Sequence, residues 1–396
     1  MTASNRIYSI DIMRGLTLIL MLFVNDLHMP GVPAWLGHRA TDFDGMGLAD
    51  WVFPGFMFMV GMAIPFAIGN RIKKGENNLS ISKHILIRSI SLIVIGVLMS
   101  NSRNVNGEFT GISKSIWSFI MYSGVFLIWN DYKETDKNKV LILCLKIAGI
   151  ALIIPMVYIF RSGGLPENGF SFRSWGILGT IGWGYLAASF IYLAFRENIM
   201  KTSLALVFFL MLNILSKLHL LDLLNPVKPV LGVLINGNAP FIVLSGLFIT
   251  VILKKLSKDS PGKAALTILS LGILSILAGF ILRKWFLISK IQSTPSWALI
   301  CNGISMVLFS LLYWIIDIKK HSSWAAFLKP AGENSLTVYL VPDMFYYIIW
   351  QLSLPLLFYK NSGTPLVVIA GSIVWALVMG ALLPVLLARI NFRLKL

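Results

Sequence analysis

The chain has 396 residues, of which 57% are hydrophobic and only 13% are charged, and its formal net charge is +17. Soluble domains carry about 25% charged residues, so this composition excludes an ordinary soluble protein. Lys and Arg lie in short loops between long apolar runs, so the positive charge indicates membrane topology and argues against a nucleic-acid partner. We therefore predict an all-α, polytopic integral membrane protein.

Apolar runs close to the roughly 20 residues that a membrane-spanning helix needs recur along the whole chain. The connections between them are short, so we expect one helical bundle without a separate soluble domain. The first run lacks a small-residue cleavage site and is expected to be a retained helix. About twelve transmembrane helices are predicted, at residues 7–25, 51–70, 84–100, 112–130, 139–160, 175–195, 202–220, 232–254, 263–282, 297–316, 335–354 and 364–388.

The loops between these runs differ in charge from one side to the other. The set that includes both termini holds 20 Lys and Arg residues, and the alternate set holds 11. Loops rich in Lys and Arg face the cytoplasm. Both termini are therefore predicted to be cytoplasmic in a bacterial inner membrane, and the loop between the first two helices is expected on the periplasmic side.

The most polar stretch of the chain lies between the first two apolar runs. A histidine there can exchange a proton near neutral pH or attack an acyl group. Sequence spacing alone does not choose between His28 and His38, and either could also be a solvated loop residue. The stretch crowds seven polar side chains into twenty-six positions: Asn25, Asp26, His28, His38, Asp42, Asp44 and Asp50.

The ends of these two runs carry further candidates. Asn25 ends the first run, where its amide either donates to a developing oxyanion or caps the helix. Asp50 begins the second run, as an N-cap or as a carboxylate that orients His38. Asp11 and Arg14 share one helical face near the cytoplasmic end. They form either a mutual ion pair or a site where Arg14 faces the phosphates of a cytosolic cofactor.

Three later residues interrupt or flank apolar segments. Asn238 in INGNAP and Asn334 in PAGENSLTVYL are amides of the kind that hydrogen-bond between helices. Lys290 in LISKIQSTPSW comes just before a span, where an interfacial anchor is the simplest interpretation. No Walker-type loop, G-x-S-x-G, HExxH or Cys/His spacing is present, so no metal site is expected.

The blocks IYSIDIMRGLTLILMLFVN and GLADWVFPGFMFMVGMAIPFAI, separated by the histidine-bearing loop, resemble the heparan-α-glucosaminide N-acetyltransferase family. The blocks LISKIQSTPSWALICNGISMVLFSLLYWIIDIKK and LKPAGENSLTVYL extend the resemblance, in the same order, into the C-terminal third. Residues 175–222 look like an extra helix pair beside a ten-helix family core.

The resemblance implies transmembrane acetylation. Cytosolic acetyl-CoA, as co-substrate, would supply an acetyl group to the amine of a glucosamine-like amino sugar, free or terminal on a glycan, on the periplasmic side. The family's catalytic histidine falls on His38 rather than His28, and its asparagine at the end of the first helix falls on Asn25. His38 would act as general base or carry a transient acetyl group.

We accordingly predict one transmembrane acyltransferase domain over residues 1–396, with the catalytic loop at 25–50. The expected partners are acetyl-CoA, the acceptor and the lipid bilayer, with a homodimer left open. The predicted site residues are His38, Asn25 and Asp50 for catalysis, Asp11, Arg14 and Asn334 for the cofactor, and Asp44, His28 and Asn238 for the substrate.

Some features differ from the family pattern, and other functions fit the same spans. The loop from His38 to Asp50 is two residues longer than is usual, and Lys114-Ser115 replaces a Gln-Arg pair. A sugar permease also has many spans and few charges, and an O-acetyltransferase acting on a periplasmic glycan differs only in its acceptor. The lack of an internal repeat, together with polar residues gathered at one face, favours a transferase over a permease.

Overall fold

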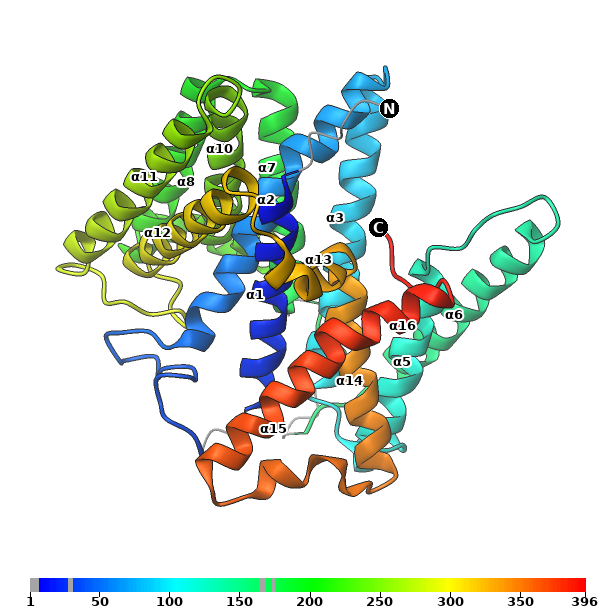
Figure 1. Ribbon diagram of the computed structural model, residues 1–396. Coiled ribbons are helices and arrows are strands. Elements are labelled where there is room, and N and C mark those ends of the chain that lie inside the picture. The colour runs from blue at the N-terminus through cyan, green and yellow to red at the C-terminus, as the bar shows by residue number, and fades with distance from the viewer. Residues whose placement is uncertain (1–6, 28–30, 164–168, 173–174) are drawn as a thin grey trace.

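The computed structural model describes residues 7–27, 31–163, 169–172 and 175–396, and its regular structure is helical (Figure 1). The longer helices are α1 Tyr8–Asp26, α2 Leu48–Lys73, α3 Asn78–Ser102, α5 Lys114–Trp129, α6 Lys139–Ile159, α7 Gly176–Phe195, α8 Ile199–Lys217, α10 Asn238–Leu256, α11 Pro261–Leu282, α12 Pro295–Leu312, α14 Ser335–Gln351 and α15 Pro365–Leu377. The shorter ones are α4 Gly107–Thr110, η2 Asp222–Val227, α9 Lys228–Asn236, η3 Tyr313–Ile318, η4 Ser323–Leu328, α13 Lys329–Glu333, η5 Pro355–Asn361, η6 Val378–Leu382 and α16 Leu383–Arg389.

The described residues contain ten helical segments long and apolar enough to cross a membrane, or eleven if α14 and η5, which meet at a 98° bend, form one span. The prediction of an all-helical membrane protein is confirmed, but the count of twelve spans is not. Each predicted run is helical, yet α5 has only 16 residues. At 1.5 Å per residue it is about 24 Å long, short of the roughly 30 Å hydrocarbon core.

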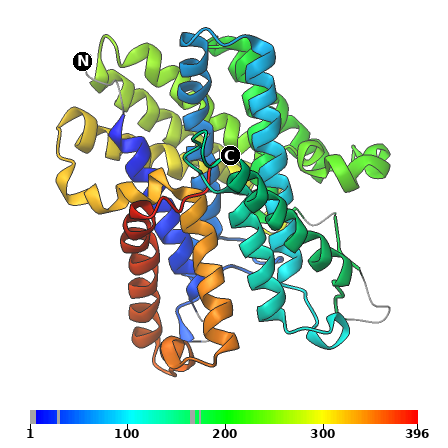
Figure 2. The same ribbon diagram turned by 90° about the vertical axis from the view of Figure 1, so that its right-hand side faces the viewer.

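Helices α1 and α2 run through the centre of the bundle. Helix α1 packs against α2, α13 and α15, and α2 packs against α10 and α7. In Figure 1, α8, α11 and α12 lie to the left of this centre, and α5, α6 and α16 lie to its right. Figure 2 shows α14 and α15 on either side of α1, with the α5–α6 hairpin next to α14.

Helices α2 and α10 cross at two glycines. A Cβ atom on Gly61 would lie 1.8 Å from the carbonyl oxygen of Val243, and one on Gly246 would lie 1.9 Å from that of Phe58. Small residues let membrane helices approach this closely, and the backbones then gain van der Waals contact along the crossing. The crossing holds α2 in place, and with it the residues at the start of α2.

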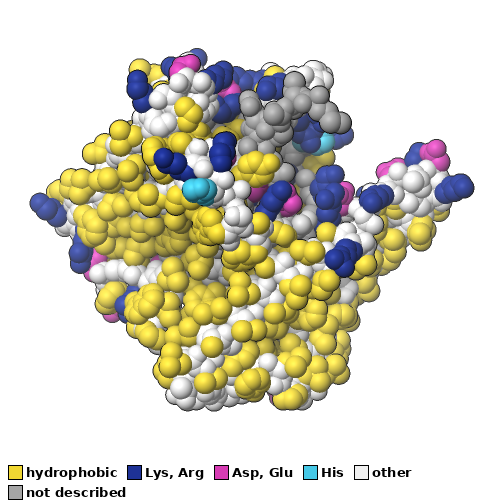
Figure 3. Space-filling view, viewed as in Figure 1, with side chains coloured by type: hydrophobic (Ala, Val, Ile, Leu, Met, Phe, Trp, Pro, Cys, Tyr) yellow, Lys and Arg dark blue, Asp and Glu magenta, His cyan; other side chains and the backbone are white. Residues whose placement is uncertain are grey.

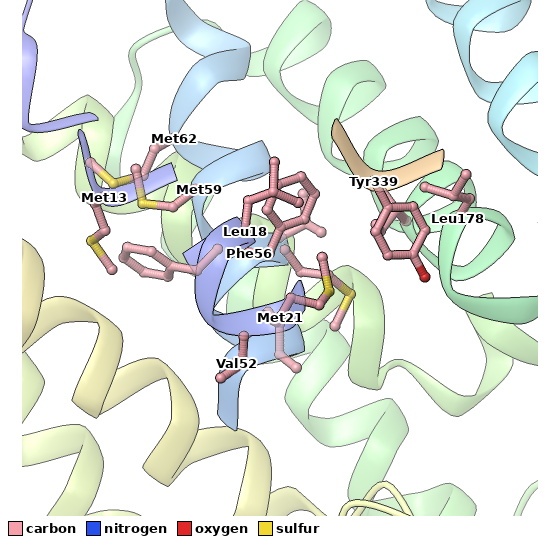
Figure 4. Close-up of a cluster of buried hydrophobic side chains, with 14 of the residues drawn as sticks. Met13, Leu18, Met21, Val52, Phe56, Met59, Met62, Leu178 and Tyr339 are labelled. Carbon is pink, nitrogen blue, oxygen red and sulfur yellow. The ribbon is translucent and has the colours of Figure 1, made fainter. Parts of the chain in front are cut away.

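The core between α1 and α2 is filled mainly by methionine and aliphatic side chains. Flexible thioether side chains fill irregular gaps well, which suits helices that cross at several angles. Figure 4 shows this cluster, with Met13, Leu18 and Met21 from α1, Val52, Phe56, Met59 and Met62 from α2, Leu178 from α7 and Tyr339 from α14.

The outer helices expose apolar side chains. In α6 and α8 most residues are not buried by the rest of the protein, which is expected for helices that face lipid. On the face in Figure 3, hydrophobic side chains cover the middle and lower parts, and Lys and Arg gather toward the upper end, where α1 begins. The loop before α2 and the α14–α15 connection lie at the lower end (Figure 1).

Candidate active site

The first turn of α2 orients a histidine from the loop before it. Oδ1 of Asp50 lies 2.8 Å from Nδ1 of His38. Oδ2 of the same carboxylate accepts hydrogen bonds from the backbone N–H groups of Gly47 and Arg39, at 3.0 and 3.2 Å. Asp50 is buried, whereas the His38 side chain is 50% exposed. Asp50 therefore caps the helix and orients the imidazole at once, and it leaves Nε2 as the ring nitrogen on the accessible side.

Lys290, from the α11–α12 connection, reaches the same histidine. Its Nζ lies 3.3 Å from Nδ1 of His38 and donates to the carbonyl oxygen of Ala49 at 3.1 Å. Nδ1 cannot donate to Asp50 and accept from Lys290 at once, so the two contacts belong to alternative tautomers. Burial lowers the pKa of Lys290 to about 8, although the nearby Asp50 charge opposes this shift. The sequence indicated only an interfacial anchor here.

The loop that carries His38 is tied to the connection that carries Lys290. Oδ2 of Asp44 accepts from Nε of Arg283 and Oδ1 accepts from the backbone N–H of Ile288, each at 2.8 Å. The hydrogen bond from Ile288, followed by the one from Arg283, lowers the pKa of Asp44. Asp44, predicted to bind substrate, thus lies between two loops and does not line the cavity described next.

A cavity of about 410 Å³ adjoins Lys290. Its size and its mixture of aromatic and polar side chains are typical of a small-molecule site. It lies among α2, α7, α9, α10 and the start of α12. The aromatic side chains of the lining are Phe53, Trp175 and Trp297, and the polar ones include Lys228, Asn236, Asn238 and Lys290.

Asn238 lines this cavity, as a substrate-binding residue would, but its amide is also part of the wall. Its Nδ2 donates to the carbonyl oxygen of Ser293 at 3.1 Å. Asn213 donates to the same oxygen at 3.1 Å and to the carbonyl oxygen of Asn236 at 3.0 Å. These amides connect α8, α10 and the loop before α12. The interhelical role considered for Asn238 is therefore realised.

The end of α1 carries the remaining loop-side candidates. Asn25 is exposed in the last turn of α1. Its neighbour Asp26 is buried and forms an ion pair with Lys360 at 2.6 Å, and it also accepts from the hydroxyls of Tyr359, at 2.7 Å, and Tyr346. His28 lies outside the described residues. The sequence analysis named Asp26 only as one of several polar residues and did not predict its ion pair. An acidic residue in the last turn of an apolar helix could have indicated a buried partner.

The residues predicted to bind the cofactor meet at the opposite end of α1. Nη1 of Arg14 donates to the carbonyl oxygen of Gly332 at 3.3 Å and lies 3.7 Å from Asp11. Asn334, two residues beyond Gly332, donates to the carbonyl oxygen of Pro330 at 3.1 Å. The structure thus brings Asp11, Arg14 and Asn334 to one crossing of α1 and α13.

That crossing has groups suited to phosphate. Arg14 keeps 20% of its side chain exposed, and Lys329 begins α13 at the same crossing. A guanidinium and an ammonium together can hold a phosphate through charge-assisted hydrogen bonds. Among the residues that the structure describes, no three His, Cys, Asp or Glu side chains converge as metal ligands.

The fold and these contacts define a class: an all-helical integral membrane protein with a carboxylate-oriented histidine beside a cavity. The family described as "Domain of unknown function (DUF5009)" matches residues 6–223, more than half of the chain. The chain belongs to this family.

Two curated relatives are also similar to part of the chain. Heparan-alpha-glucosaminide N-acetyltransferase from Mus musculus is 35% identical over 100 residues, which is 25% of this chain and 15% of that protein. The Homo sapiens protein of the same name is 35% identical over 96 residues, which is 24% of this chain and 14% of that protein. These matches confirm the resemblance seen in the sequence, and they span about a seventh of the relatives' length.

Proposed function

We propose that the chain is a transmembrane acetyltransferase. It moves the acetyl group of cytosolic acetyl-CoA to the amine of an amino sugar, free or terminal on a glycan, at the periplasmic face of a bacterial inner membrane. The observation that carries this proposal is the 2.8 Å contact between His38 and Asp50 next to a cavity of about 410 Å³. The partial similarity to two N-acetyltransferases supports the reaction class.

In this proposal His38 handles the proton that acyl transfer to an amine releases. With Nδ1 donating to Asp50, Nε2 has a lone pair with which to take a proton from the attacking amine. The buried carboxylate then stabilises the imidazolium that forms. His38 can next pass that proton to the leaving thiolate, so the products are the acetamide and the free thiol. A transient acetyl group on Nε2 would use the same orientation.

Asn25 is the proposed donor to the oxyanion of the tetrahedral intermediate. Its exposed amide lies in the last turn of α1 and is open to a ligand. Losing one such donor typically slows a reaction by about 10²–10³. Asp44 and Asp26 would act indirectly, since their contacts hold the α11–α12 connection and the end of α1.

Arg14, Lys329 and Asn334 are the proposed residues for the phosphates of acetyl-CoA. Arg14 precedes Asn25 by eleven residues of one helix, which corresponds to roughly 16 Å along its axis. If Arg14 binds the phosphates of an extended ligand, the acyl end of that ligand can extend along the helix toward Asn25. This spacing supports one helix serving both ends of the reaction.

The proposed orientation has both termini in the cytoplasm. Counted over the twelve predicted runs, the loops on that side hold 20 Lys and Arg residues, against 11 on the other, which supports this orientation. Arg14 then lies toward the cytoplasm and His38 toward the periplasm. A cysteine placed in each terminus and in the 31–47 loop, probed with a membrane-impermeant thiol reagent in cells, tests this arrangement.

The reaction itself is tested with purified protein in nanodiscs. We expect acetyl-CoA to release free thiol over many turnovers only when glucosamine is present, and His38→Ala to abolish this release. A product that resists mild alkali is an amide, whereas an alkali-labile product is an ester and would favour the O-acetyltransferase. Uptake of unmodified sugar into proteoliposomes, with His38→Ala fully active, would instead identify a permease.

A further inference from the structure

Lys290 holds an amine beside His38, next to Nδ1 of the ring. Its side chain lines the cavity of about 410 Å³, and its Nζ lies 3.3 Å from the ring of His38. Among the described residues, its hydrogen-bond partners are a backbone carbonyl and that ring, and no carboxylate forms an ion pair with it. A lysine stem is flexible, so Nζ can move within the cavity without a change in the backbone.

The charge state of this amine favours reaction. The charges of Asp50 and of Cys301 on α12 act on Lys290, and His38 contacts it. Lys228 lines the same cavity. Burial outweighs the attraction of Asp50 and lowers the pKa of Lys290 to about 8. About half of the amine is then unprotonated at pH 8, roughly a hundred times the fraction of an exposed lysine.

We propose that Lys290 is a self-acetylation site, which takes the acetyl group when no acceptor occupies the cavity. This inference rests on the proposed acetyltransferase function. The unprotonated Nζ attacks the thioester carbon of acetyl-CoA, an N–C bond forms and the C–S bond breaks. In the tautomer that carries its proton on Nε2, Nδ1 of His38 accepts the amine proton from Nζ. The proton on Nε2 goes to the leaving thiolate, so the products are Nζ-acetyl-lysine and the free thiol.

Acetylation would change the cavity in two ways. It removes the positive charge that faces Asp50, and it places an acetamide where the acceptor would bind. The modified protein is therefore expected to bind acceptor poorly. The acetylated fraction of Lys290 would therefore increase with the time for which the enzyme binds acetyl-CoA without an acceptor.

The test uses the full-length protein in nanodiscs, isotopically labelled acetyl-CoA at pH 8 without sugar, and peptide mass spectrometry. We expect label at Lys290 at least about tenfold above that at two comparison lysines. Lys228 lines the same cavity without touching His38, and Lys284 is exposed in the same connection. Added glucosamine should suppress the label, and its rate should rise as the pH increases toward 8 and then level off.

Variants and a parallel assay separate this inference from the proposed function. His38→Ala should reduce the label at Lys290 to the level of Lys284, and Lys290→Arg should remove it. Equal labelling of the three lysines, or unchanged labelling in His38→Ala, would mean ordinary chemical acetylation. An unlabelled Lys290 in a preparation that acetylates glucosamine refutes self-acetylation alone, and a preparation that does neither refutes both.

Discussion

Nδ1 of His38 lies 2.8 Å from Oδ1 of Asp50, and the same carboxylate accepts the N–H of Gly47 at the start of α2. The orientation of the histidine is thus part of how the helix begins. Side-chain direction at a helix N-terminus is set by the capping geometry, so the imidazole needs no ligand to be held in place.

Replacing Asp50 by Asn should impair the reaction more than the fold. The amide keeps the size of the side chain but removes the negative charge that stabilises the imidazolium. We expect kcat to fall by about 10- to 100-fold with KM nearly unchanged. Asp131→Asn is the matched control, since Asp131 is paired with Arg393 and Lys395 far from the site. An unaltered kcat for Asp50→Asn would show that the contact is only structural.

Asp44 should contribute a pH-dependent restraint. Its pKa is lowered in the folded protein by Ile288 and Arg283. Such a carboxylate stabilises the fold above its unfolded pKa, and that stability is lost as the pH falls through the folded pKa. Because the pair is exposed, the contribution should stay below about 1 kcal/mol. Thermal unfolding of Asp44→Asn should fall below that of the unaltered protein at pH 7, and the difference should shrink as the pH falls below 3.8 through the lowered pKa.

The buried pair of Asp26 and Lys360 should behave as a unit. Removing one partner leaves a buried charge, so Asp26→Asn or Lys360→Met alone should cost about 3 kcal/mol of unfolding free energy. The double variant should recover most of this loss. Unfolding in a denaturing detergent, followed by tryptophan fluorescence, gives the double-mutant cycle. Additive losses in the two single variants would mean that the 2.6 Å contact carries no coupling.

Arg14 should contribute to the binding of acetyl-CoA and not to the binding of the sugar. Arg14→Gln removes a charged donor at the α1–α13 crossing, which should raise the KM for acetyl-CoA by about 10- to 100-fold. The KM for glucosamine should not change. With acetyl-pantetheine, which lacks the nucleotide phosphates, Arg14→Gln and the unaltered protein should react equally. An equal defect with both acyl donors would place Arg14 outside the phosphate site.

The sequence by itself determined the helical membrane fold and the polar stretch between its first two helices. The length of an apolar run and the charge of a loop are local properties that determine how a segment inserts into the bilayer. They can therefore be recognised without knowledge of the tertiary contacts. The local pairing of Asp11 and Arg14, three residues apart, was likewise visible from helical periodicity. The number of spans was less predictable, because the length of α5 and the bend after α14 depend on where neighbouring helices end.

Only the tertiary structure decided which polar residues share a site. Lys290 reaches His38 across 252 positions of sequence, and the sequence offered no reason to prefer it over other interfacial lysines. The same holds for Lys360 at Asp26 and for the amides around Asn238. Such contacts depend on the positions at which the helices cross. Glycines such as Gly61 and Gly246 help to fix these positions, because they let two helices approach closely. Hydrophobic patterns place each helix in the membrane, but packing alone chooses its neighbours.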